Sequence, residues 1–258
     1  MCRLAAYLGP RLLLKRFLID PPHSLVRQAW APREMTEAVL NADGYGFGWY
    51  PDNGNAATYV YTGPIWADVN LAGLSESLTS HLWMANVRSA TPGQHTGVAN
   101  TQPFASGRIL FMHNGFIENF TSGARTRFHR HLRPEIQAGI GGNTDSEYLF
   151  ALYRQHCDGE SYDLADALRR ALDDFTNLCP DTTAYLNFVL GDGKKLYAVR
   201  HAVNGPCPTL YYSRNDRLYP GASVIASERL TPDPEWRAIP EHSLIVLSGE
   251  HAPELRAL

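Results

Sequence analysis

Cys2 is the residue of this sequence best placed to act as a nucleophile. Methionine aminopeptidase removes Met1 when the next side chain is small, and the chain would then begin with a cysteine. A cysteine thiol has a pKa near ~8.5 and an α-amine one near ~7.7–8, so both groups titrate around neutral pH. A free α-amine can take the proton of its own nucleophile, as it does for N-terminal threonine. A small second residue also serves simply to permit this trimming, so the position alone leaves both interpretations open.

Two later segments place polar groups where a strand is expected to end. Arg88 follows the apolar run 82–87, and its planar guanidinium suits bidentate capture of a carboxylate. A surface ion pair is the alternative. Asn114 and Gly115 follow the apolar run 109–112, and a side-chain amide beside a backbone N–H is the geometry that an oxyanion hole needs. Asn-Gly is also a favoured turn, so a simple turn is the alternative here.

A carboxylate, Asp145, stands in the first turn of an expected helix. Thr144 is a suitable N-cap, and Glu147 three residues later completes the pattern of a capping box. An acidic residue at this point is favoured by the helix dipole alone. The functional alternative is a carboxylate that receives an ammonium group.

The elements that must position these residues are strands at both ends of the chain, with helices between them. Gly9-Pro10 is expected to end the first strand, and the segment 52–55 (Asp-Asn-Gly-Asn) predicts a hairpin. Helices are expected from about Thr144 onwards and over 162–175. The order strands, helices, strands is typical of layered sheets and helices. Strands are expected at 2–8, 45–50, 57–61, 82–87, 109–112, 185–190, 196–200, 209–212, 223–226 and 244–247.

Composition excludes several functional classes. The chain has 258 residues, with 23 Lys+Arg against 26 Asp+Glu, a net charge of −3. This balance argues against disorder, against a nucleic-acid partner and against attraction to an anionic membrane. The four cysteines show no C-x-x-C spacing and the histidines no metal spacing, so we expect no metal and no cofactor. With no signal peptide or membrane span expected, the sequence predicts a cytoplasmic protein and a single domain over 1–258.

Taken together, these segments resemble the class II glutamine amidotransferases, which belong to the N-terminal-nucleophile (Ntn) hydrolase superfamily. Each motif is weak alone, but six of them follow one another in the family's order over residues 1–150, and the segment 226–228 (Ala-Ser-Glu) resembles a late family motif. The resemblance implies an α+β fold, a four-layer αββα sandwich of two mostly antiparallel sheets. The six segments are Met1-Cys2, Asp43-Gly44, Arg88–Thr91, Asn100–Phe104, His113–Gly115 and Thr144–Glu147.

The resemblance also implies a role for each candidate residue. Cys2 would attack the γ-carbonyl of a γ-glutamyl group, with its α-amine as general base. The side chain of Asn114 and the backbone N–H of Gly115 would stabilise the oxyanion. A thioester would form, and water would then release glutamate.

At the substrate, the same resemblance implies that Arg88, with Thr91 nearby, holds the α-carboxylate of the glutamyl group. Asp145 would hold its α-ammonium, helped by the backbone of Gly115. One cation and one anion at a fixed separation recognise the glutamyl group whatever the leaving group is.

Within the class, the resemblance is closest to the γ-glutamyl-hercynylcysteine sulfoxide hydrolases of ergothioneine biosynthesis, which act on a small-molecule γ-glutamyl substrate. The segments that carry this likeness include 20–22 (Asp-Pro-Pro), 31–33 (Ala-Pro-Arg) and 64–66 (Pro-Ile-Trp). Two alternatives remain. One is a glutaminase subunit that supplies ammonia to a separate synthetase partner, and the other is a non-catalytic module of the same fold.

Overall fold

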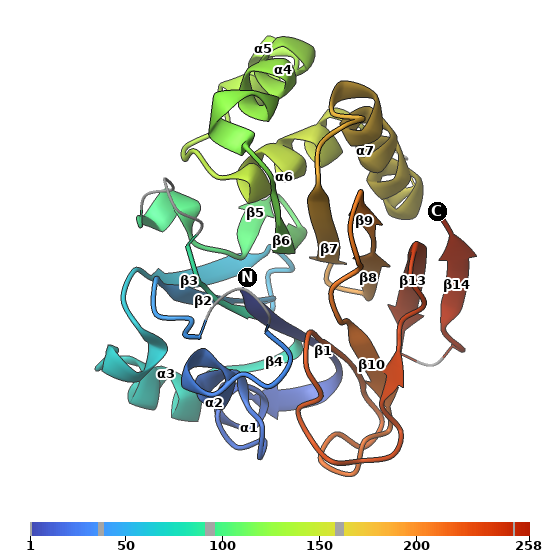
Figure 1. Cartoon of the computed structure of the whole chain (residues 1–258). Helices are drawn as coiled ribbons and strands as arrows, with labels where there is room; N and C mark the ends of the chain where they lie inside the picture. The colour runs from blue at the N-terminus through green and yellow to red at the C-terminus, as the bar shows by residue number, and fades with distance from the viewer. Residues whose placement is uncertain (1, 36–38, 91–95, 158–162, 250) are drawn as a thin grey trace.

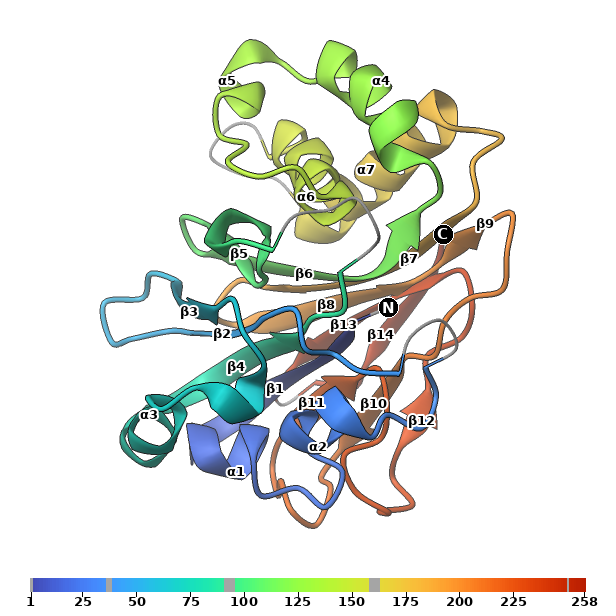
Figure 2. The ribbon, with the colours of Figure 1, turned by 60° about the vertical axis from the view of Figure 1, so that its left-hand side comes forward.

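The computed structural model describes residues 2–35, 39–90, 96–157, 163–249 and 251–258. Two large antiparallel sheets lie face to face, and helices cover the outer side of each (Figures 1 and 2). In the view of Figure 2, helices α4 (Ala124–His131), α5 (Pro134–Gln137), α6 (Asp145–Gln155) and α7 (Leu164–Leu178) lie above the sheets, and helices α1 (Leu14–Leu18), α2 (Leu25–Trp30) and α3 (Leu71–Ser77) lie below. The expected four-layer αββα sandwich is confirmed.

The first sheet, sheet A, takes strands from both ends of the chain. Within the described residues, its order is β12-β10-β11-β1-β4-β2-β3, so the N-terminal strand β1 lies in the middle. The hairpin expected around 52–55 is the connection between β2 and β3. The strands are β1 (Arg3–Leu13), β2 (Tyr45–Trp49), β3 (Ala57–Tyr61), β4 (Thr79–Val87), β10 (Tyr211–Arg214), β11 (Ser223–Ala226) and β12 (Arg237–Ala238).

The second sheet, sheet B, has the order β14-β13-β8-β7-β6-β5, and β9 pairs with β7. Strand β5 pairs only with the first residues of β6, up to Phe111, so the later part of β6 has an open edge on that side. The strands are β5 (Phe104–Ser106), β6 (Ile109–Ile117), β7 (Ala184–Gly191), β8 (Lys195–Arg200), β9 (Ala202–Val203), β13 (Ser243–Ser248) and β14 (Glu254–Ala257).

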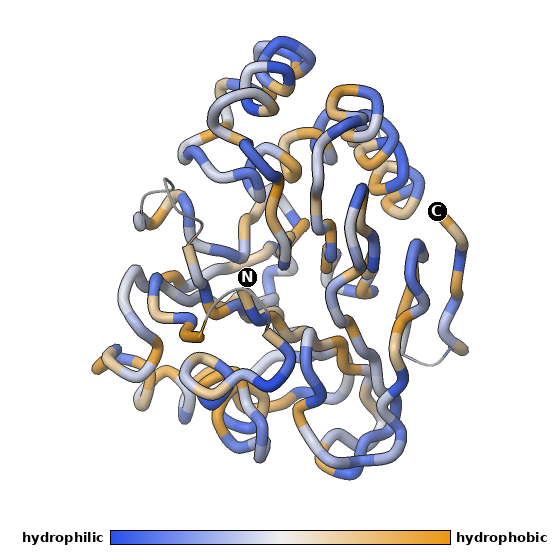
Figure 3. The backbone as a smooth tube through the Cα atoms, viewed as in Figure 1, coloured by the Kyte–Doolittle hydropathy of each residue, from blue (hydrophilic) through white to orange (hydrophobic). Residues whose placement is uncertain are grey.

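Side chains alternate between the two faces of each strand, and this period of two builds three apolar layers. Leu4, Ala6 and Leu8 of β1 lie between the sheets, while Ala5 and Tyr7 pack toward helices α1 and α2. Helix α7 alternates hydrophobic and hydrophilic residues along its length, as an amphipathic helix on a sheet does (Figure 3). The inter-sheet layer also contains Leu82 and Met84 of β4, Leu110 and Met112 of β6, and Val189 of β7.

Gly9-Pro10 does not end the first strand, contrary to expectation. Strand β1 runs on to Leu13, and its pairing with β4 shifts in register between Leu8 and Leu12. Proline has no N–H to donate to the hydrogen-bond ladder of a sheet. A bulge leaves the residue unpaired, so no such hydrogen bond is needed there. The hydroxyl of Tyr7 donates to the carbonyl of Pro10 at 2.7 Å and ties the bulge back to the strand.

Candidate active site

Cys2 lies directly before β1, in the centre of sheet A, and is almost fully buried. It follows the alternation of Leu4 and Ala6, so its side chain belongs to the face of β1 that looks toward sheet B. The thiol donates to the carbonyl of Ser89, with the sulfur 3.8 Å from the oxygen. The structure therefore brings the expected nucleophile to the end of β4, where Arg88 begins the following segment.

Asn114 faces the same inter-sheet layer from the opposite sheet. In β6 it lies on the same face as Leu110 and Met112, four and two residues away, and β1 contacts β6 across this layer. Its side chain is fully buried, and neither amide atom has a hydrogen-bond partner among the described residues. A buried donor or acceptor without a hydrogen bond costs about 1–3 kcal/mol. The folded chain therefore carries an amide that a bound molecule can satisfy.

Gly115 is inside strand β6 and not in a turn, so the turn interpretation of Asn114-Gly115 is wrong. Asn114 pairs with Asn187 and Gly115 with Leu186 in the β6–β7 ladder. A Cβ on Gly115 would overlap the carbonyl oxygen of Tyr185 in β7. Glycine is needed here because the neighbouring strand approaches too closely for any side chain.

The backbone N–H of Gly115 points out of the open edge of β6. In this strand the N–H of His113 donates to Gln102 Oε1 at 2.6 Å, and the N–H of Ile117 donates to Asp145 Oδ2 at 2.9 Å. Alternate N–H groups of a strand point the same way, so the Gly115 N–H lies between these two contacts. The edge thus places a backbone donor beside both the Asn114 amide and the Asp145 carboxylate.

Asp145 begins helix α6 and is buried. Its Oδ1 accepts from the N–H of Ser146 at 2.8 Å, so the carboxylate is fixed in place between helix and strand. The ring of His113 bridges Ser146 Oγ at 2.9 Å and the Tyr185 carbonyl at 2.8 Å. Burial lowers the pKa of His113, which keeps this bridge neutral, although the nearby Asp145 opposes the shift.

The helix start is capped as expected only in part. The Thr144 hydroxyl accepts from the N–H of Glu147 at 3.2 Å, which confirms the N-cap. The Glu147 carboxylate does not return to Thr144 as a capping box requires. It accepts instead from the N–H groups of Gly141 and Gly142, both at 2.7 Å, and so fixes the loop that leads into the helix.

Arg88 is also buried, directly after β4. Its Nη1 donates to the carbonyl of Asp43 at 3.3 Å, and Asp43 Oδ2 accepts from the N–H of Ala90 at 2.8 Å. The Asp43-Gly44 motif therefore holds the segment that carries Arg88. Thr91, the expected companion of Arg88, lies outside the described residues.

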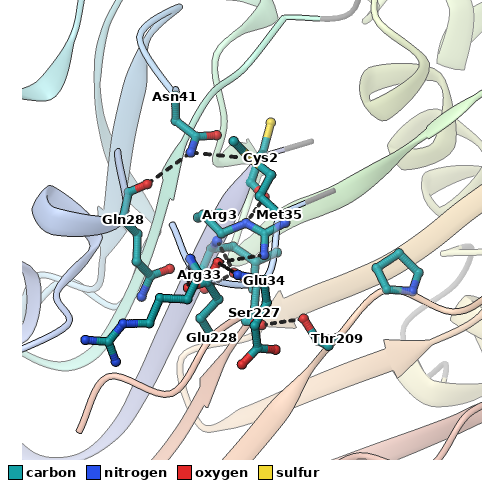
Figure 4. Close-up of polar contacts among 12 residues, drawn as sticks. Cys2, Arg3, Gln28, Arg33, Glu34, Met35, Asn41, Thr209, Ser227 and Glu228 are labelled. Carbon is teal, nitrogen blue, oxygen red and sulfur yellow. Dashed lines mark hydrogen bonds and ion pairs between the residues drawn. The ribbon is translucent and has the colours of Figure 1, made fainter. Parts of the chain in front are cut away.

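A buried ionic network fixes the residue next to the nucleophile (Figure 4). Arg3 Nε donates to the carbonyl of Cys2 at 2.7 Å, and Arg3 Nη1 lies 3.1 Å from Glu228 Oε1. Glu228 also accepts from the ring of His23 at 2.6 Å and from the N–H groups of Arg33 at 2.9 Å and Glu34 at 3.0 Å. Burial acts to raise the pKa of Glu228, but these hydrogen bonds and the Arg3 charge hold it below its ordinary value.

Ser227 holds the next residue of the chain. Its Oγ accepts from the N–H of Leu4 at 3.0 Å and donates to the Leu4 carbonyl at 3.2 Å. The late Ala226-Ser227-Glu228 motif thus clamps the first residues of β1 from the neighbouring strand β11. Sequence reasoning found the motif but assigned no role to Glu228 or to Arg3. The only signal was the position of Arg3 beside Cys2.

Asn86 is a second buried amide that sequence reasoning passed over. It pairs with Leu4 of β1 and shares the inter-sheet face with Met84. Both of its amide atoms lack a hydrogen-bond partner among the described residues. The period of two in β4 is the signal that could have found it.

The other cysteines lie outside this arrangement. Burial raises the pKa of the Cys179 and Cys207 thiols, which disfavours a reactive thiolate at either. In the described part of the chain, Cys207, Glu241 and His242 hold ligand atoms within 4.8 Å of one another, a set that could bind a metal ion. Glu241 already pairs with Arg200 at 3.2 Å, so ion pairing accounts for its place as well. No helix of the described residues is both long and apolar enough to cross a membrane.

Comparisons with known proteins agree on one family. A model of the family "Glutamine amidotransferases class-II" matches residues 23–214. The chain is 30% identical over 252 residues to the gamma-glutamyl-hercynylcysteine sulfoxide hydrolase of Mycolicibacterium smegmatis, covering 97% of each protein. It is also 30% identical over 297 residues to the probable glutamine amidotransferase DUG3 of Saccharomyces cerevisiae, covering 97% of this chain and 82% of that protein.

Solved structures share the fold. A glutamine aminotransferase class-II domain protein from Silicibacter pomeroyi superposes with a TM-score of 0.72 at 24% identity, covering 99% of both chains. The glutamine phosphoribosylpyrophosphate amidotransferase of B. subtilis gives 0.67 at 17% identity, covering 99% of this chain and 49% of that one. The chain therefore shares the architecture of these two proteins.

Proposed function

Because the chain belongs to the class II glutamine amidotransferases, which are hydrolases of linear amide C–N bonds, we propose that it cleaves a γ-glutamyl amide through a Cys2 thioester. The observation that carries the proposal is the fully buried Asn114 amide on β6, which has no hydrogen-bond partner among the described residues and faces the same layer as the Cys2 thiol at the start of β1. A nucleophile and an unused oxyanion donor on opposite walls of one layer suit acyl transfer.

The proposed reaction starts once Met1 is removed. The α-amine of Cys2 takes the thiol proton, and the sulfur attacks the γ-carbonyl carbon of the substrate. The same proton then goes to the amide nitrogen as the C–N bond breaks, and the amine leaves. Water hydrolyses the thioester, which regenerates the thiol and releases glutamate.

The oxyanion of each tetrahedral intermediate is proposed to bind between the Asn114 amide and the Gly115 N–H. Both donors sit on one rigid strand, fixed by the β7 ladder on one side and by Gln102 on the other. Donors held in place before the reaction need no reorganisation when charge develops, which is why such a site can contribute about 2.7–4 kcal/mol per donor.

The charged ends of the glutamyl group are proposed to bind Arg88 and Asp145. Arg88 would take the α-carboxylate, with Thr91 beside it, and Asp145 with the Gly115 backbone would take the α-ammonium. Support comes from burial, because both charged side chains lie inside the protein at the two strand ends that flank Cys2 and Asn114.

For the leaving group, we propose the cysteine S-oxide conjugate of hercynine, as in γ-glutamyl-hercynylcysteine sulfoxide. Support comes from the relative in M. smegmatis that bears this activity in its name and aligns over 97% of both proteins. The function then belongs to ergothioneine biosynthesis, and the protein needs no cofactor.

The test is glutamate release by the purified protein from two substrates, L-glutamine and γ-glutamyl-hercynylcysteine sulfoxide. We expect kcat/KM for the conjugate to exceed that for glutamine, and both activities to vanish in Cys2→Ala. Cys179→Ala is the matched control, since its buried thiol lies in the helix-side core and should leave turnover unchanged.

Three results would redirect the proposal. Full activity in Cys2→Ala would refute the thioester mechanism. A clear preference for glutamine, or silence on both substrates until a synthetase partner is added, would favour an ammonia-supplying subunit. If the wild-type protein keeps Met1 in every molecule and shows no turnover, a non-catalytic module would be favoured.

A further inference from the structure

A cleft of about 560 Å³ lies on the helix side of sheet A, with Glu228 in its lining. Its wall is made by residues around the ends of β11 and α2, including His23, Arg33, Glu34, Tyr211 and Arg229. Strand β1 begins, β11 ends and β10 begins at the same end of sheet A. The cleft therefore lies at the end of the sheet that carries Cys2. The volume falls in the ordinary range for small-molecule sites, about 300–1,000 Å³.

The charges in this cleft do not neutralise one another. Arg33 and Arg229 are exposed, and within the described residues no ion pair links either one to an acidic group. The Arg229 guanidinium lies 4.9 Å above the Tyr211 ring. Glu34 accepts from the Tyr211 hydroxyl at 2.9 Å, a neutral donor that leaves the carboxylate charge in place. Arg33, Arg229, Glu34 and the Tyr211 ring therefore surround one space, beside a second carboxylate, Glu228, whose charge is paired with Arg3.

Backbone contacts join this cleft firmly to the nucleophile. The N–H groups of Arg33 and Glu34 donate to Glu228, and Glu228 holds Arg3, whose Nε reaches the carbonyl of Cys2 (Figure 4). The cleft wall and Cys2 thus keep a fixed relation through buried hydrogen bonds. The Cys2 thiol faces sheet B and the cleft faces the helices, so a substrate held at its glutamyl end by Cys2 must pass around the start of β1 to reach this wall.

We propose that the cleft binds the leaving group of the substrate, a betaine that carries two carboxylates and one quaternary ammonium. This inference rests on the proposed function, because hercynylcysteine sulfoxide is such a betaine. Arg33 and Arg229 would each pair with a carboxylate through planar guanidinium groups. Glu34 and the Tyr211 ring would receive the quaternary ammonium, for which carboxylates and aromatic faces are suitable partners. L-glutamine, whose leaving group is ammonia, would leave the cleft empty.

The experiment compares KM for γ-glutamyl-hercynylcysteine sulfoxide, γ-glutamylcysteine and L-glutamine in Arg33→Ala, Arg229→Ala and Glu34→Gln. Each variant keeps the backbone N–H groups that hold Glu228. We expect KM for the conjugate to rise about tenfold or more, the loss expected for a charged hydrogen bond, while KM for glutamine stays within twofold. KM for γ-glutamylcysteine, whose leaving group has one carboxylate and no quaternary ammonium, should be unaffected by Glu34→Gln. Arg130→Ala, an exposed arginine of α4, is the matched control.

A parallel rise of KM for glutamine would overturn the inference, because it would mean that the residues only support the fold. An unchanged KM for the conjugate would overturn it too. A second measurement separates failure of this inference from failure of the proposed function. It is the calorimetric titration of Cys2→Ala protein with free hercynylcysteine sulfoxide. Binding that Arg33→Ala weakens would support the cleft even if the wild type prefers glutamine, and absence of binding would refute it even if the conjugate is hydrolysed.

Discussion

Arg3 Nη1 lies 3.1 Å from Glu228 Oε1, and both side chains are 1% exposed. The two residues are 225 positions apart in the chain, and their contact joins the first residues of β1 to the end of β11. Since Arg3 also bonds the carbonyl of Cys2, the position of Cys2 depends on a carboxylate near the other end of the protein.

Replacing Glu228 should therefore destabilise the protein. Removing one partner of a buried ion pair costs about 3–5 kcal/mol, because it leaves the other charge uncompensated. We expect Glu228→Gln to lower the free energy of unfolding by this order at pH 7, measured by urea denaturation. Glu76→Gln, which breaks the exposed pair with Lys15, is the control and should change it little. Equal stability of Glu228→Gln and wild type would contradict the account.

The same pair predicts an acid dependence. The folded-state pKa of Glu228 is lowered, so its stabilisation is complete above the ordinary carboxyl pKa near ~4.3 and is lost as pH falls through the lower folded value. Wild type and Glu228→Gln should therefore converge in stability as the pH is brought from 7 to below about 4. A gap that stayed constant over this range would show that the carboxylate charge is not responsible.

Asn114→Ala should remove catalysis and spare the fold. Loss of one oxyanion donor lowers kcat about 10²–10³-fold, and the amide has no partner within the described residues to lose. Asn187→Ala is the matched control, since Asn187 lies opposite on β7 and donates to the carbonyls of Pro208 and Thr209. Asn187→Ala should lower Tm more than Asn114→Ala does, and it should lower kcat less. Steady-state kinetics and thermal unfolding of both variants decide, and the reverse pattern would refute the oxyanion role.

Gly115→Ala should damage the fold and not merely the chemistry. The added Cβ would overlap the Tyr185 carbonyl, so β6 and β7 must separate at the active-site end. We expect a loss of about 1–3 kcal/mol or more, seen as a lower Tm or as insoluble protein. Gly73→Ala is the contrasting variant, because that helical position is open, and alanine there should stabilise α3 by roughly 1 kcal/mol. A tolerated Gly115→Ala would mean that the strands can adjust at this point.

Removal of Met1 should switch the enzyme on. The proposed base is the α-amine of Cys2, and a preceding residue would convert that amine into an amide that cannot accept a proton. We expect a fusion protein to be inactive until a site-specific protease frees Cys2 at the terminus, with intact mass and glutamate release followed together. A cleavage that leaves one extra residue before Cys2 is the control. Undiminished turnover with that residue present would rule out the α-amine as base.

Local patterns in the sequence predicted many of the elements and named the candidate residues, but helices α1, α2 and α3 and strands β5, β9, β12 and β14 were not among the predictions. The hairpin between β2 and β3, the Thr144 cap and the Ser223–Ala226 strand depend on near neighbours in the chain, so short-range rules found them. The resemblance over residues 1–150 supplied the layered fold and the roles, since no periodicity reveals which strands pair. The roles of the site residues, the single domain and the cytoplasmic location stay predictions.

Only the tertiary structure decided how these residues meet. The Asn114-Gly115 pair has the composition of a turn, yet pairing with β7 extends it as strand, because ladder hydrogen bonds and packing outweigh a local preference. Likewise, the period of two says that Cys2 and Asn114 each belong to one face of a strand, but the stacking of two sheets makes those faces oppose each other. The Arg3–Glu228 pair depends on the same long-range assembly. The sequence thus predicts which residues carry the chemistry, while their placement around one layer follows from how the two sheets pack.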